Sequence, residues 1–95
     1  MPVTALEKNG AFKHCRSVAW RQVADEAVIL NVDTVVYYSL RGAGLRMWEL
    51  LGDGKSASDI ARILTQEYEA SEDGIRKDCA DLICKLRKES LVEPA

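Results

Sequence analysis

The chain has 95 residues, of which 47% are hydrophobic and 29% are charged, and its formal net charge at pH 7 is -2. This length allows one domain with a small core, which leaves little apolar surface for a deep catalytic cavity. The slightly acidic balance argues against a protein that holds DNA through a clustered basic face, and against one that binds an anionic membrane surface. No apolar run approaches the ~18 residues that span a bilayer, and no apolar signal segment opens the chain, so we expect a cytoplasmic protein.

The three cysteines, Cys15, Cys79 and Cys84, do not form a disulfide framework, because their number is odd and their spacing is wide. Cys79 and Cys84 lie on one predicted helix and point about 140° apart, which excludes a bond between them. The single histidine, His14, forms no zinc-ligand cluster, and a Cys–His catalytic pair would need a distant cysteine brought to it. We therefore expect reduced cysteines, no metal, no cofactor and no catalytic residue.

Extended segments come first along the chain. Residues 1–11 are aperiodic and are expected to form a loose segment ahead of a single domain over residues 12–93. Residues 18–23, 27–30 and 35–40 are rich in β-branched and aromatic residues and are separated by short polar turns. Such short connections predict an antiparallel meander of three strands.

Helical periodicity follows after Gly44, where Leu45, Trp48 and Leu51 recur on one face up to a stop at residues 52–54. Ser56, with Asp59 three residues later, predicts the start of a second helix. Ser71 predicts the start of a third, which has acidic residues in its first turn and basic residues in its last turns. Segregated strands and helices predict an α+β fold, a winged helix-turn-helix in which a three-stranded antiparallel sheet is followed by three helices.

The strand, Gly-x-Gly and helix of residues 35–51 also invite a dinucleotide-binding interpretation. That motif needs a third glycine where this chain has Met47, and a parallel strand where Ser56 opens another helix. A structural interpretation accounts for the glycines better. Gly42 can supply an unusual backbone angle at the strand exit, and Gly44 can let the helix approach the sheet.

From Val18 to Val92 the chain resembles the PqqD family, the proteins D of pyrroloquinoline quinone (PQQ) biosynthesis. The residues that carry this resemblance are Trp20-Arg21, Tyr37-Tyr38, Leu40, Gly44, Trp48-Glu49-Leu50-Leu51, Gly54, Ile60-Ala61, Leu64, Tyr68, Asp78, Leu86 and Leu91. Two positions depart from the family pattern: Arg41 stands where asparagine is usual, and Ser90 where glycine is frequent. Both are structural positions, and the first bears on how the helix after the third strand is capped.

The resemblance implies a peptide chaperone that is not an enzyme. Proteins of this kind are RiPP recognition elements, which bind the leader of a ribosomally made precursor peptide as an added strand against the third strand, in a groove beside the third helix. They present the precursor to a modifying enzyme, which in PQQ biosynthesis is a radical S-adenosylmethionine (radical SAM) protein. Related domains serve lasso peptides and other modified peptides.

The third strand has the physical character that such a role requires. Its six residues include no charge and no proline, the usual devices that protect a sheet edge. An edge left open for a partner and an edge covered by another part of the chain both fit this pattern. The predicted peptide-binding residues here are Val35, Val36, Tyr37, Tyr38, Ser39 and Leu40, with either Tyr37 and Ser39 or Val36 and Tyr38 contacting the peptide.

Helical angles indicate which side of the third helix faces a peptide. With Ile75 at 0°, Leu82, Leu86 and Cys79 lie within about 40° and form the core seam. One shoulder carries the predicted groove residues Arg76, Ala80, Ile83 and Arg87, whose arginines suit an acidic leader. The alternative is that Ile83 only widens the core stripe and the arginines are solvated helix ends.

A DNA-binding winged helix is the second functional hypothesis. From Ser71 to Ser90 there are five basic and five acidic residues, so the third helix lacks the uncompensated basic character of a recognition helix. We therefore expect a peptide partner and no nucleic acid. An unpaired edge also allows edge-paired homodimers, so both a monomer and a dimer remain open.

Overall fold

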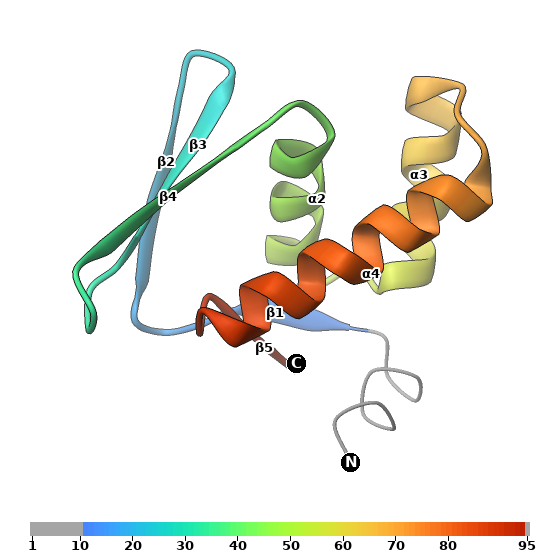
Figure 1. Cartoon of the computed structure of the whole chain (residues 1–95). Helices are drawn as coiled ribbons and strands as arrows, with labels where there is room; N and C mark the ends of the chain where they lie inside the picture. Colours follow the sequence, from blue (N-terminus) through green and yellow to red (C-terminus); the bar gives the residue numbers. More distant parts are fainter. Residues whose placement is uncertain (1–10, 95) are drawn as a thin grey trace.

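The computed structural model describes residues 11–94 and shows the strands first and the helices after them (Figure 1). In chain order the elements are β1 (Phe12–His14), β2 (Val18–Val23), β3 (Glu26–Asn31), β4 (Val36–Arg41), α2 (Gly42–Gly52), α3 (Ala57–Tyr68), α4 (Glu72–Lys88) and β5 (Val92–Pro94). A three-stranded antiparallel sheet followed by three helices confirms the predicted α+β class. The loose segment predicted for residues 1–11 lies almost wholly outside the described residues. Within residues 11–94, no helix combines the length and the apolar character needed to cross a membrane.

The main sheet has the strand order β2-β3-β4, so β2 and β4 are its two edges. Its register pairs Trp20 with Ile29 and Ile29 with Tyr38. Because side chains alternate along a strand, Ala27 and Ile29 are buried on the face that receives the helices, while Leu30 on the other face is only half-buried. The helices all lie on one side of this sheet (Figure 1).

The turn before β4 contains a residue that we predicted to be in the strand. Val35 has a φ of 59°, a left-handed conformation that β-branched residues rarely adopt. The side-chain oxygen of Asn31 accepts hydrogen bonds from the amides of Asp33 and Thr34, at 3.0 and 3.3 Å. This local asparagine turn overrides the strand preference of valine, so β4 begins at Val36.

Helix α2 follows β4 without a connecting loop. Gly42 has a φ of 54°, which confirms the unusual backbone angle predicted at the strand exit. The helix begins at Gly42, earlier than predicted, and its N-cap Arg41 makes no side-chain capping hydrogen bond. The interpretation of Gly44 is wrong, because a Cβ atom there would make only ordinary contacts, 3.7 and 3.8 Å from Leu40.

Both predicted serine caps are confirmed. The Ser56 hydroxyl accepts a hydrogen bond from the Asp59 amide at 3.1 Å, at the start of α3. The Ser71 hydroxyl accepts one from the Gly74 amide at 3.1 Å, at the start of α4. Each cap satisfies a backbone donor that the helix itself cannot pair, which contributes about 1 kcal/mol.

A second, two-stranded sheet was not predicted. Strands β1 and β5 pair antiparallel, with Phe12 opposite Pro94 and His14 opposite Val92. Phe12 is almost fully buried, and α4 packs against β5. Three-residue strands carry too little alternation to be read from sequence, and yet this pair closes one side of the core.

Candidate functional site

Strand β4 presents an open edge. It pairs with β3 on one side, and no other strand among residues 11–94 pairs with its far side. Alternate backbone N–H and C=O groups along an edge strand point away from the sheet and are available to another chain. The charged residue of β4, Arg41, lies at the strand end and forms an ion pair with Glu26 at 3.4 Å, so no charge interrupts the strand itself.

A hollow of about 220 Å³ lies between β4 and the C-terminal half of α4. Its lining residues are Tyr38, Ser39, Leu40, Leu82, Lys85, Leu86, Glu89 and Leu91. Four leucines give it an apolar floor, while a lysine and a glutamate from α4 and the segment after it supply its charged groups. The hollow therefore combines a strand edge with an apolar pocket directly beside it.

Hydrogen bonds from β4 and from β3 reach Glu89, the residue that follows α4. The Tyr38 hydroxyl donates to Glu89 Oε1 at 2.7 Å, and the side-chain amide of Asn31 donates to the Glu89 carbonyl oxygen at 3.2 Å. Asn31 is buried, and both polar ends of its side chain are hydrogen-bonded: the amide nitrogen to Glu89 and the oxygen to the Asp33 amide. The hydrogen bond to Glu89 also raises the pKa of the Tyr38 phenol, which keeps it protonated as a donor at neutral pH.

The predicted strand residues lie at or next to this hollow. Tyr38, Ser39 and Leu40 line it. Val36 and Tyr37 are exposed on the same edge strand but do not line it, and Val35 lies in the preceding turn. Tyr37 is opposite Leu30, on the sheet face away from the hollow. The lining therefore includes one residue of each alternating set, Tyr38 and Ser39.

The predicted residues of α4 do not line the hollow. Arg76 is exposed and pairs with Glu72 at 2.9 Å, and Ala80 is exposed on the same helix. Ile83 is 1% exposed and belongs to the core, in line with the alternative interpretation that it widens the core stripe. The Arg87 guanidinium lies 5.8 Å from the centre of the Phe12 ring, on the side that faces β1.

The physical reason for this difference is the rotation of α4. Its buried residues are Ile75, Cys79, Ile83 and Leu86, so the seam is centred about 40° away from Ile75, towards Ile83. The opposite flank then faces β4. Sequence reasoning missed Leu82, Lys85 and Glu89 there, although all three lie on this flank in the same helical projection.

Within residues 11–94 the thiols and the histidine do not gather into a metal site. Among residues 11–94, no group of three or more His, Cys, Asp or Glu side chains could hold a metal ion. Cys15, Cys79 and Cys84 are free thiols. Burial raises the pKa of Cys79 to about 11 and also raises the pKa of Cys15, so both stay protonated and weakly nucleophilic at neutral pH.

Comparisons with known proteins connect this geometry to a family. Residues 26–92 match the family described as Coenzyme PQQ synthesis protein D (PqqD), whereas no curated protein matches the chain significantly. The chain is similar to the solved structure of TbiB1 in complex with the TbiA(beta) leader peptide, with 29% identity and a TM-score of 0.83 over 87% of this chain and 96% of that one. It is also similar to lasso peptide synthetase B1 complexed with the leader peptide, with 26% identity and a TM-score of 0.81 over 87% of this chain and 98% of that one. The family match runs from β3 to β5 and agrees with the resemblance seen in the sequence, and the chain belongs to the PqqD family.

Proposed function

We propose that this protein is a non-catalytic chaperone for a ribosomally made precursor peptide. It binds the leader of the precursor as an added strand on β4 and presents the rest of the peptide to a modifying enzyme. The observation that carries this proposal is the open edge of β4 beside an apolar hollow. The two similar structures, both of which hold a leader peptide, support it.

Strand addition divides the work of recognition between backbone and side chains. Hydrogen bonds to the β4 backbone hold any extended peptide, whereas pockets for alternate side chains give specificity. The leucine floor between β4 and α4 accepts an aliphatic side chain from the added strand. Lys85, an exposed cation at the same hollow, matches an acidic residue next to that side chain in the leader.

The clamp between Tyr38 and Glu89 prepares this site for binding. Because Tyr38 of β4 and Asn31 of β3 are already hydrogen-bonded to Glu89 at the end of α4, the two walls of the hollow need not be ordered when the peptide arrives. Pre-organisation of this kind reduces the entropic cost of binding a flexible peptide. The leader itself still has to become ordered, so we expect moderate affinity.

The modifying enzyme belongs to one of two classes in this proposal. The family description names PQQ synthesis, for which the partner is a radical SAM protein, whereas one of the two similar structures is a lasso peptide synthetase B1. The same open edge permits an edge-paired homodimer, which would compete with the leader for β4. A leader peptide should therefore shift any dimer to monomers.

A titration monitored by amide chemical shifts tests the proposal. The probes are the leader peptides of short precursors encoded beside the gene, and the TbiA(beta) leader as a heterologous peptide. We expect shifts confined to β4 and to the hollow residues of α4, with a saturable dissociation constant. A DNA duplex tests the alternative function: if only DNA shifts these amides, with a steep dependence on salt, the peptide-binding proposal is wrong.

A further inference from the structure

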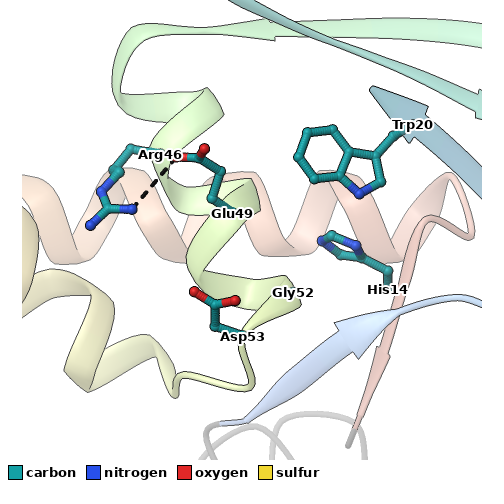
Figure 2. A pocket seen from close by; sticks show the side chains of 6 residues that line it. All are labelled: His14, Trp20, Arg46, Glu49, Gly52 and Asp53. Carbon is teal, nitrogen blue, oxygen red and sulfur yellow. Dashed lines mark ion pairs between the residues drawn. The ribbon is translucent and has the colours of Figure 1, made fainter. Parts of the chain in front are cut away.

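A second hollow, of about 350 Å³, lies beside the opposite edge of the main sheet. Its lining residues are His14, Trp20, Arg46, Glu49, Gly52 and Asp53, which come from β1, β2, α2 and the residue after α2 (Figure 2). None of them lines the hollow beside β4. A peptide added to β4 would therefore leave this second hollow open.

Stacked aromatic rings build one wall. The His14 ring lies parallel to the Trp48 indole, with ring centres 3.6 Å apart and planes 9° apart. Trp20 meets both rings edge-on, at 5.9 Å from His14 and 6.0 Å from Trp48. Trp48 is fully buried, whereas Trp20 is 37% exposed, so part of an indole remains available to a ligand.

Two further contacts hold His14 in this wall. Its Nε2 atom lies 2.9 Å from the carbonyl oxygen of Trp48. A Cβ atom at position 52 would lie only 2.7 Å from His14 Cε1, so glycine is needed there to admit the ring. The position of the His14 ring is thus determined by the C-terminal end of α2, through the Trp48 carbonyl and Gly52.

The facing wall carries an excess of negative charge. Arg46 donates three hydrogen bonds to Glu67, which lies outside the hollow: Nε to both carboxylate oxygens at 3.1 and 3.3 Å, and Nη2 to one of them at 3.0 Å. Its contact with Glu49 is longer, at 3.5 Å. Asp53 has no ion pair with any residue from 11 to 94. One arginine and two carboxylates therefore line the hollow, and the arginine is bonded mainly to a third carboxylate outside it. Burial lowers the pKa of His14, which leaves the imidazole uncharged at pH 7.

We propose that this hollow binds a basic side chain, lysine or arginine, of the modifying enzyme. The cation lies against the exposed part of the Trp20 indole and pairs with the carboxylates of Asp53 and Glu49. Figure 2 shows the rings of Trp20 and His14 on one side of the hollow and these two carboxylates on the other. Tryptophan is the best aromatic partner for a cation, and a nearby carboxylate adds an ion pair.

The assignment to the enzyme rests on the proposed function, whereas the chemistry of the ligand does not. The hollow lies beside β2, and the leader is proposed to lie along β4, at the other edge of the sheet. An enzyme that binds at the hollow beside β2 can therefore associate with this protein without displacing the leader from β4. The precursor itself is the other possible source of a basic side chain, and the experiment separates the two.

Small probes test the ligand chemistry first. N-acetyl-arginine amide should shift the Trp20 indole and the Gly52 and Asp53 amides progressively, at millimolar concentrations. N-acetyl-citrulline amide, which has nearly the same shape but no charge, should not. Asp53→Asn and Trp20→Leu should each weaken the arginine probe about fivefold, as expected for one exposed ion pair or cation–π contact. Asp25→Asn, which removes a carboxylate from the β2–β3 turn, is the matched control and should change nothing.

The proposal is overturned if citrulline shifts the same signals equally, or if Asp53→Asn leaves the arginine probe unaffected. The source of the cation is then tested with the leader and with the enzyme. Asp53→Asn should weaken capture of the enzyme and leave the dissociation constant of the leader unchanged. A leader that binds Asp53→Asn more weakly would assign the cation to the precursor and overturn the assignment to the enzyme. Leu82→Asp, in the other hollow, should leave the arginine probe unaffected, which separates this result from a failure of peptide binding.

Discussion

The two edges of the main sheet present different chemistry to a partner. Beside β4 the hollow is floored by leucines and adjoins unpaired backbone, whereas beside β2 it is walled by aromatic rings and carboxylates. Backbone pairing suits a flexible peptide, because strand addition needs no particular side chain at every position. A fixed aromatic and acidic pocket suits a single side chain on a folded partner. Under the two proposals above, a domain with no room for a deep cavity holds two partners at once.

The largest expected effect is on leader affinity, and it should differ between the flank of α4 that faces β4 and the opposite flank. Leu82→Asp places a charge in the apolar hollow, where its desolvation should weaken leader binding by about 30-fold, roughly 2 kcal/mol. Ala80→Asp adds the same charge to an exposed position of the same helix and should have no measurable effect. Calorimetric titration measures both, with circular dichroism as a check on folding. Equal losses would mean that the leader does not use this hollow.

Alanine substitutions at two glycines of α2 test whether the His14 ring is packed tightly against Gly52. Gly52→Ala forces a Cβ atom against the His14 ring and should lower the free energy of unfolding by about 1–2 kcal/mol, as other overpacked sites do. Gly44→Ala, in the same helix, meets only ordinary contacts and should be neutral or stabilising by about 0.5 kcal/mol. Urea denaturation gives both values. In a His14→Ala background the cost of Gly52→Ala should disappear, and its persistence would contradict the proposed contact.

A smaller effect distinguishes the two cations near the end of α4. Lys85 lines the β4 hollow, whereas Arg87 lies over Phe12 on the other flank. Lys85→Glu should weaken an acidic leader by about three- to fivefold at low salt, the range of an exposed ion pair. Arg87→Glu, at a position that the sequence predicted to line the groove, should have no effect. If Arg87→Glu weakened leader binding more than Lys85→Glu in the same titration, the peptide would lie on the Arg87 side of α4, as the sequence analysis predicted.

The smallest effect concerns the protonation of His14. Burial lowers its pKa below the usual 6.5, while the Trp48 carbonyl and Asp53 oppose this shift. The unfolded chain therefore binds this proton more readily than the folded protein does. The histidine contribution to stability is complete above pH 6.5 and is lost as the pH falls through the lowered pKa. Because the chain has one histidine, its ring resonance in untagged protein reports the pKa directly. A value of 6.5 or higher would contradict the burial described here.

Local signals in the sequence were sufficient for much of the fold. Ser56 and Ser71 act within three residues, so the starts of α3 and α4 could be predicted without tertiary information. The dense β-branched and aromatic run before Gly42 likewise predicted the edge strand. Val35 was misplaced because the hydrogen bonds of Asn31 decide the turn, and these outweigh the preference of the valine itself.

The rotation of α4 could not be predicted from its own sequence. A helical projection gives the angles between residues but not the direction of the core, which depends on the elements that pack around the helix. We assigned Ile83 and Arg87 to a groove because the sequence did not predict β1 and β5 on that side of the helix. Phe12, beneath Arg87, belongs to this small sheet. The hollow beside β4 therefore lies on the other flank of α4 from the groove that we predicted from the sequence.

The pairing of β1 with β5 also determines how this domain can be joined to other polypeptides. Phe12 lies opposite Pro94, so a backbone that enters the fold at one of these residues leaves it beside the other. Domains with adjacent entry and exit points can be grafted into a surface loop of a host protein without stretching either junction. Neither residue lines the hollow beside β4, so an engineer could insert this module into an unrelated enzyme and keep the edge of β4 exposed.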